Sequence, residues 1–124
     1  MKRLILGTGL LLALFAGSLA VWWGMEAKHR PVAERLTLAA VLSASGDGTA
    51  ARETAFHART QWQENWHFTA AFADHTPMEE IDDLFRALDA YDPVSDEFAA
   101  CCLQLSQRTQ AMAEAHKLNW WSLL

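Results

Sequence analysis

The sequence predicts an all-α protein, with an N-terminal transmembrane helix followed by a small antiparallel bundle of about four helices. Residues 4–25 carry no charge. In the rest of the chain, apolar residues recur at spacings of three and four, as on the buried face of a helix. Turn-forming clusters around Gly46, Pro77 and Pro93 divide this part into helical stretches. We therefore expect a membrane anchor over residues 1–25 and an extracytoplasmic helical bundle over residues 26–124.

The uncharged stretch has the length and flanks of a membrane anchor. Its 22 residues span roughly 33 Å as a helix, which suffices for a hydrocarbon core of about 30 Å. Lys2 and Arg3 precede it, and Trp22 and Trp23 lie where an aromatic belt is typical. These features predict a single-pass signal-anchor in the cell membrane, with the C-terminal domain outside the cytoplasm.

Two alternatives accompany the anchor. Ser18 and Ala20 place small residues at the positions that a signal peptidase inspects, so a signal peptide cleaved after Ala20 is the rival interpretation. The apolar run continues past that point, which favours the anchor. Small residues at four-residue spacing, Gly9, Ala13 and Gly17, would allow a homodimer through the anchor, although an Ala- and Gly-rich segment produces such rows by chance.

The first helix of the bundle is predicted over residues 32–45. Pro31 is expected to interrupt the preceding helix or to restart it at a first-turn position. The turn-forming residues 45–48 end this first helix. Its apolar face consists of Val32, Leu36, Ala39 and Leu42.

A long helix is predicted over residues 50–74, with Thr49 placed to cap it. Its apolar residues cover two faces, which is typical of a helix packed between neighbours. We therefore expect Trp62 and Trp66 to belong to the core, with a ligand platform as the alternative.

The next helix begins at a sharp break in the pattern. Thr76 is the expected N-cap, Pro77 lies in the first turn, and Glu79 completes a capping box. His75 is expected just past the end of the preceding helix, where an imidazolium interacts well with the last carbonyls. The apolar stripe of the new helix is Met78, Ile81, Leu84, Phe85, Leu88 and Tyr91.

The last helix is predicted over residues 94–118, capped by Asp92 or Ser95. Its stripe is Phe98, Cys102, Leu105, Thr109, Met112 and His116. Residues 119–124 include Trp120 and Trp121 and are too apolar to extend freely into water. We expect this tail to fold back over the bundle, with the membrane interface or a partner as the alternative contact.

The charge of the chain argues against a nucleic-acid-binding protein, and its cysteine content argues against a disulfide framework. The net charge is −5, and because Lys2 and Arg3 precede the anchor, the remainder carries eight Lys and Arg against fifteen Asp and Glu. Such a domain repels nucleic acid. The acids concentrate between residues 74 and 97, where Arg86 is the only Lys or Arg, and a solvated acidic face is the simplest interpretation. Cys101 and Cys102 are adjacent on a helix and therefore cannot form a disulfide with each other. We expect both to be buried as small apolar residues.

No pattern in the chain predicts catalysis, a metal site or a cofactor. Glu26 with His29 and Glu64 with His67 match the Glu-x-x-His spacing of di-metal bundles, but the two pairs lie at different depths. A group of Asp74, His75 and Glu79 around Zn²⁺ is better explained by helix capping. Nucleophile elbows, phosphate-binding glycine loops and Cys-x-x-Cys pairs do not occur in the sequence, so we expect a protein that is not an enzyme.

Several short motifs carry a resemblance to a known family. The chain has a basic start, a single anchor, a Gly-Asp-linked helix pair with Trp62-x3-Trp66, the run Phe72-Ala73-Asp74-His75-x5-Ile81, and Asn119 near its end. Over nearly its whole length it resembles the bacterial family called domain of unknown function 4363. The resemblance implies a membrane-anchored helical architecture and export, and it implies no mechanism.

The sequence thus leaves two functional hypotheses. The first is a non-enzymatic interaction or scaffold module of the bacterial cell envelope, which presents its acidic region and aromatic surfaces to an envelope protein. The second is a ligand- or metal-sensing domain with a groove between the helices at 50–74 and 94–118. The candidate interaction and groove residues are Trp62, Trp66, His67, Asp74, His75, Trp120 and Trp121.

Overall fold

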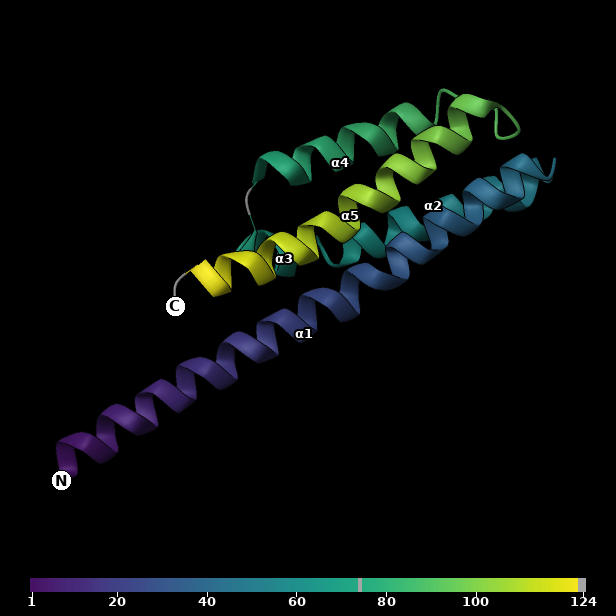
Figure 1. The fold of residues 1–124 in the computed structure, drawn as a ribbon. Coiled ribbons are helices and arrows are strands. Elements are labelled where there is room, and N and C mark those ends of the chain that lie inside the picture. The colour runs from purple at the N-terminus through teal and green to yellow at the C-terminus, as the bar shows by residue number, and fades with distance from the viewer. Residues whose placement is uncertain (74, 123–124) are drawn as a thin grey trace.

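The computed structural model describes residues 1–73 and 75–122, and it describes no side chain at Phe72 or beyond Glu114. The described residues form helices and no strand, which confirms the all-α prediction. Five helices are present in this part of the chain: α1 Lys2–Ala44, α2 Gly48–Glu64, α3 Trp66–Phe72, α4 His75–Leu88 and α5 Asp96–Ser122 (Figure 1).

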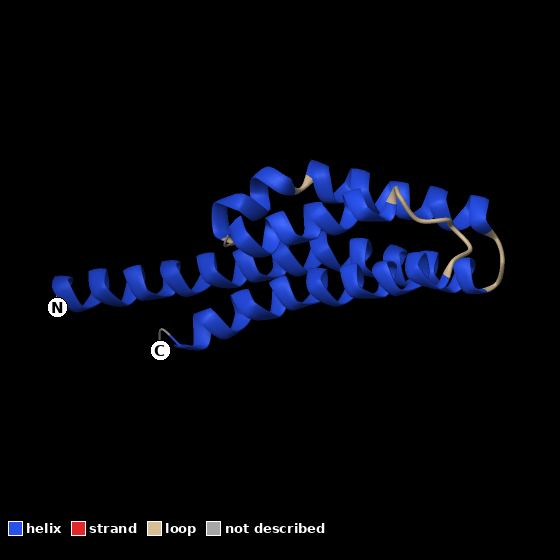
Figure 2. Cartoon of the chain, turned by 90° about the horizontal axis from the view of Figure 1, so that it is seen from above, coloured by secondary structure: helices blue, strands red, loops and turns tan. Residues whose placement is uncertain are grey.

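Helix α1 is 43 residues long and has two parts. Its N-terminal part projects away from the other helices, while its C-terminal part packs against α2 and α5, and α4 covers α5 on the other side (Figures 1 and 2). The most apolar window of α1 has no buried residue, and its length and composition suit either a membrane anchor or a signal sequence.

The bundle has one contiguous apolar core, to which α1, α2, α4 and α5 all contribute. Trp62, Phe85 and Phe98 are its largest buried side chains. As expected, the stripes of α4 and α5 face inward, except that Tyr91 lies beyond the end of α4 and is 36% exposed. The predicted position of His116 on the α5 stripe lies outside the described side chains.

Pro31 lies inside α1, so the expected interruption of the helix is wrong. Proline removes one backbone hydrogen bond and crowds the preceding turn. The carbonyl that loses its donor is that of Ala27, and the Asn65 amide donates to the next carbonyl along, that of Lys28, at 3.2 Å. Met25, His29, Val32 and Leu36 form one buried stripe across the proline. Burial of this stripe keeps the helix continuous. The predicted boundary between the anchor and the bundle, at residues 25 and 26, therefore falls within α1.

We expect the Asn65→Ala variant to lower the free energy of unfolding by about 1 kcal/mol, because it removes the donor to a backbone carbonyl in the turn that Pro31 loosens. In a Pro31→Ala background, where the turn regains its N–H, the same substitution should cost less. A double-mutant cycle from urea unfolding of the full-length protein in detergent micelles measures this coupling. Equal costs in both backgrounds would show that Asn65 does not support the proline turn.

The predicted helix over residues 50–74 is divided at Asn65 into α2 and α3. The Asn65 side chain binds α1 through the Lys28 carbonyl oxygen. Thr69 donates both its backbone N–H and its hydroxyl to the Asn65 carbonyl oxygen. The start of α2 also differs from the prediction. Asp47, and not Thr49, caps the helix by accepting the Ala50 N–H at 3.2 Å.

The remaining boundaries differ by a few residues. Helix α4 begins at His75, so His75 belongs to its first turn instead of following the preceding helix, and Thr76 is not its cap. Ser95 caps α5, since its hydroxyl oxygen accepts the Phe98 N–H at 3.2 Å. The backbone of α5 continues to Ser122, so the expected fold-back of the tail does not occur over residues 119–122.

Candidate functional site

One cavity among the described residues, which we call the aromatic cavity, has a volume of about 370 Å³ and lies between α2, α3 and α4. It brings together three of the predicted candidates, Trp62, Trp66 and His67. The groove was expected between their helix and the last helix, whereas α4 forms the facing wall. Its other lining residues are Arg59, Gln63, Asp82, Phe85 and Arg86.

Asp82 of α4 organises the wall of the aromatic cavity. Its two carboxylate oxygens accept hydrogen bonds from the indole nitrogens of Trp62 at 2.7 Å and Trp66 at 3.3 Å. The four-residue spacing places both indoles on one side of the α2–α3 unit, facing α4. Trp62 is fully buried and Trp66 is partly buried, so the prediction of a core role is confirmed for Trp62.

The two arginines at the rim of the cavity already have acidic partners. Arg59 pairs with Asp89 at 2.6 Å, and Arg86 pairs with Asp83 at 3.4 Å. His67 is exposed and meets Trp66 edge-on, with ring centroids 5.8 Å apart. The lining thus combines indole rings with guanidinium groups that are already ion-paired.

The other predicted candidates do not all join this site. His75 is exposed, and its ring lies 6.3 Å from that of Trp66, centroid to centroid. Asp74 lies outside the described residues, and the side chains of Trp120 and Trp121 lie outside the described part of α5.

We expect Asp82→Ala to lower the free energy of unfolding by about 2 kcal/mol, since two indole N–H groups lose their acceptor at a partly buried site. Asp83→Ala removes the neighbouring carboxylate, whose ion pair is exposed, and should cost less than about 0.5 kcal/mol. Urea unfolding followed by circular dichroism compares the two variants. Similar losses for both would indicate that Asp82 acts only through the charge of α4.

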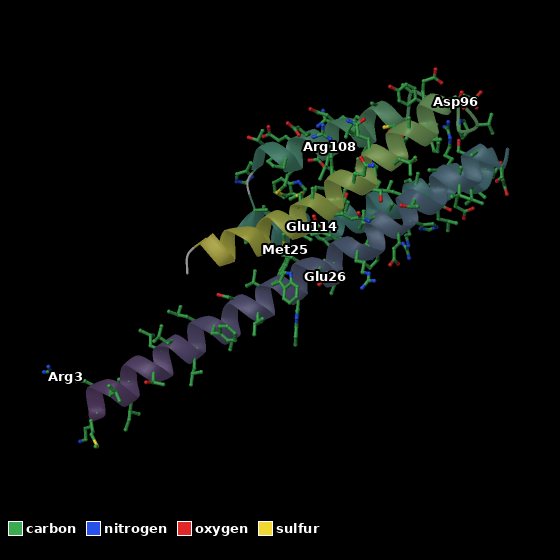
Figure 3. The ribbon with its side chains drawn as sticks, in the orientation of Figure 1. Arg3, Met25, Glu26, Asp96, Arg108 and Glu114 are labelled. Carbon is green, nitrogen blue, oxygen red and sulfur yellow. The ribbon has the colours of Figure 1, made fainter. Side chains whose placement is uncertain are left out.

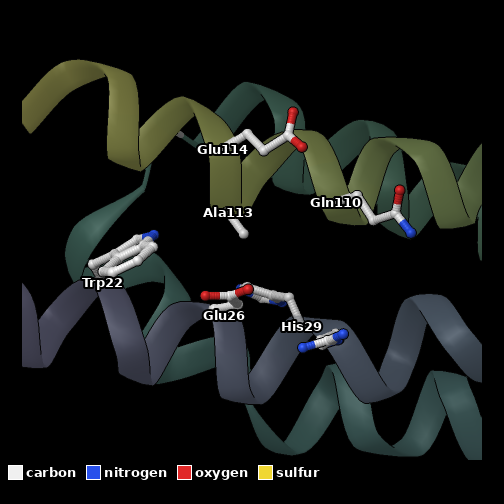
Figure 4. Close-up of a pocket in the computed structure, with 7 residues that line it drawn as sticks. Trp22, Glu26, His29, Gln110, Ala113 and Glu114 are labelled. Carbon is white, nitrogen blue, oxygen red and sulfur yellow. The ribbon is translucent and has the colours of Figure 1, made fainter. Parts of the chain in front are cut away.

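Another cavity, which we call the interface cavity, has a volume of about 310 Å³ and lies between α1 and α5. Figure 3 shows Met25 and Glu26 where α1 meets the bundle, far from Arg3 at the other end of the helix. The cavity is lined by Trp22, Glu26, His29, Arg30, Gln110, Ala113 and Glu114, six of which are labelled in Figure 4.

His29 is the buried polar residue of this region, with 1% of its surface exposed. Its Nε2 lies 3.1 Å from the Thr69 hydroxyl, and its ring packs on Trp62 at 5.6 Å between centroids. Burial, with a smaller contribution from the nearby Lys28 charge, lowers the pKa of His29 to about 4. The imidazole is therefore neutral at pH 7.

Four of the nine acids between residues 74 and 97 have side-chain partners within the described part of the molecule. The sequence placed only Arg86 near these acids, yet the fold brings Arg59 and Arg108 to them from other helices. The pairs are Glu80 with Arg108, Asp83 with Arg86 and Asp89 with Arg59, in addition to the indole bonds of Asp82. The surface is consequently less available to a basic partner than the charge count predicts.

The two cysteines are free and buried, as expected. Burial raises the pKa of the Cys101 thiol, and it raises that of Cys102 to about 12, with a further contribution from Cys101. The Cys101 thiol donates to the Leu84 carbonyl oxygen at 3.5 Å. Both groups are protonated at neutral pH, which makes them poor nucleophiles.

Metal-ligating side chains do not converge among the described residues, where no three His, Cys, Asp or Glu are placed to share an ion. The sequence analysis missed the role of Asp82, which it included in the solvated acidic face, and the burial of His29. The signal for His29 was present, because it lies four residues after Met25 and three before Val32 on one helix face. The expected interruption at Pro31 concealed that periodicity.

Comparison of the chain with protein-family models, with curated proteins and with solved structures finds no match. The resemblance to the family of domain of unknown function 4363 accordingly stays a prediction.

Proposed function

We propose that this protein is a membrane-anchored, non-enzymatic interaction module, whose bundle lies on the outer surface of the membrane and binds another envelope protein there. The continuity of α1 is the observation that carries the proposal. One helix includes both the exposed apolar segment and the buried stripe of the bundle. A bundle joined in this way has a fixed position next to the bilayer, unlike a domain on a flexible linker.

Exposed apolar side chains on the bundle supply the proposed contact. Leu38 and Val41 of α1 are 50% and 59% exposed, and their three-residue spacing places them on one face of the helix. Leu103 of α5 is 46% exposed. An apolar contact of this kind is better supported than one through the acidic region, because four of the nine acids there already have side-chain partners among the described residues.

Photo-crosslinking in native membranes tests this proposal. A photoreactive residue at Leu38 or Val41 is expected to capture one defined protein, and the same residue at Glu53, an exposed polar position on α2, is expected not to do so. Capture that is equal at all three positions, or absent at all, would contradict the proposal. A reporter fused after Leu124 tests sidedness, since activity in the cytoplasm would overturn the outward orientation.

The aromatic cavity favours a second candidate function, the binding of a small ligand by the same anchored domain. Trp62 and Trp66 line the cavity, and a ligand carboxylate would replace the aspartates with which Arg59 and Arg86 pair. Planar aromatic carboxylates are the matching class of ligand.

A thermal-shift screen of the full-length protein in micelles compares aromatic carboxylates with their neutral amides. The carboxylates are expected to raise Tm, and Arg86→Gln should reduce that rise more than Arg52→Gln, which changes an arginine outside the aromatic cavity. If neither class of compound changes Tm, the ligand-binding function is excluded.

A further inference from the structure

The interface cavity contains hydrogen-bond acceptors that lack donors. Within the described part of the chain, the carboxylates of Glu26 and Glu114 have neither a hydrogen bond nor an ion pair. Glu26 comes from α1 and Glu114 from the facing helix α5 (Figure 4). Two carboxylates from two helices therefore line one cavity, and neither pairs with the Arg30 guanidinium, the cation that the described residues contribute to its lining.

His29 adds a third acceptor, and its tautomer follows from its neighbours. The Thr69 hydroxyl donates its only hydrogen to the Asn65 carbonyl oxygen at 3.0 Å. It can therefore only accept from His29, so the proton of the imidazole is on Nε2. Nδ1 keeps an unshared electron pair, and it has no hydrogen-bond partner although it is buried. A buried acceptor without a donor is unfavourable, which favours a ligand that donates.

The charges around the cavity favour a cation. Arg30, the one basic residue that lines it, already pairs with Glu34 at 3.3 Å. His29 is neutral at pH 7 because burial lowers its pKa. The lining therefore carries uncompensated negative charge from Glu26 and Glu114, and it disfavours a phosphate or carboxylate as the group bound between them.

The position of the cavity indicates where such a cation comes from. Glu26 directly follows the last residue of the uncharged stretch, and Trp22 lines the cavity one turn before it. If α1 spans the membrane as proposed, these residues lie at the depth of the lipid head groups. A lipid that lies beside the anchor brings its head group to this depth at high effective concentration.

We infer that the interface cavity binds the primary ammonium group of a phosphatidylethanolamine head group, with Glu26 and Glu114 as its carboxylate acceptors. This inference rests on the proposed membrane anchoring. A primary ammonium has three N–H donors for the acceptors present, whereas the trimethylammonium group of phosphatidylcholine has none. The cavity therefore distinguishes the two zwitterionic head groups by hydrogen bonding, since their charges are the same.

The test is native mass spectrometry of the full-length protein released from nanodiscs that contain equal amounts of phosphatidylethanolamine and phosphatidylcholine. We expect the wild type to retain phosphatidylethanolamine at least fivefold more often. The double variant Glu26→Gln with Glu114→Gln should lose this preference. The control Glu64→Gln, which removes an exposed carboxylate outside the cavity, should keep it. Ala113→Leu fills the cavity without changing its charge and should also abolish the preference.

Three outcomes would overturn the inference: equal retention of both lipids by the wild type, an unchanged preference in the double variant, or displacement of the lipid by millimolar ethanolamine in solution, which would indicate a site for soluble amines. Carbonate extraction of native membranes separates this failure from that of the proposed function. A wild-type protein that resists extraction but shows no lipid preference would contradict only the lipid site. A protein that is extracted would contradict both.

Discussion

Replacing Trp62 with alanine is expected to lower the free energy of unfolding by about 3–5 kcal/mol, most of the stability available to a bundle of this size. Trp62 is fully buried where α1, α2 and α4 meet. Its loss removes the largest side chain of the core, the ring contact with His29 and one of the two indole donors to Asp82. Urea unfolding of the full-length protein in micelles, followed by circular dichroism, measures the effect.

Two further variants separate volume from hydrogen bonding at this position. Trp62→Phe keeps an aromatic ring but removes the indole donor, so it should cost clearly less than Trp62→Ala. Phe56→Ala removes an aromatic residue of α2 that is 64% exposed, and its cost should stay below about 0.5 kcal/mol. Comparable losses for Phe56→Ala and Trp62→Ala would contradict the core role of Trp62.

Acidification is expected to destabilise the fold through His29. The pKa of His29 falls from 6.5 to about 4 on folding. Its contribution to stability is therefore complete above pH 6.5 and is lost as the pH falls toward 4, because only the unfolded chain takes up the proton in this range. Between pH 7.5 and pH 5 the loss from this residue amounts to about 2 kcal/mol.

The free energy of unfolding of the wild type, measured as a function of pH, is compared with that of two histidine variants. His29→Phe keeps a ring in the core and removes the titrating group, so its stability should depend less steeply on pH between 7.5 and 5. His57→Gln changes an exposed histidine and should follow the wild type. The role assigned to His29 fails if His29→Phe retains the slope of the wild type.

The helices and the buried faces could largely be predicted from periodicity, because each stripe packs against the others in one core. The stripes of α4 and α5 are examples, and so is the cap at Ser95. The errors occurred where contacts distant in the sequence decide the outcome. Pro31 interrupts isolated helices, but here the buried stripe around it and the Asn65 amide hold α1 together.

The candidate site was predictable in its aromatic part only. The four-residue spacing of Trp62 and Trp66 identifies them as neighbours on one helix face, and they line a cavity with His67. The acceptor that joins them, Asp82, lies sixteen residues after Trp66 on another helix. No local pattern distinguishes Asp82 from the acids beside it, because its role depends on which face of α4 meets α2. The interface cavity depends in the same way on the pairing of α1 with α5.

The unbroken course of α1 fixes the rotational phase between the segment outside the bundle and the bundle itself. Each residue of an α-helix turns the chain by about 100°. One residue inserted between Phe15 and Trp22 would therefore turn the bundle by that angle relative to the N-terminal part of α1, whereas seven residues would nearly restore its direction. Any torque applied to one part of α1 is thus transmitted to the other, and the direction in which the bundle faces is set by residues that do not touch it.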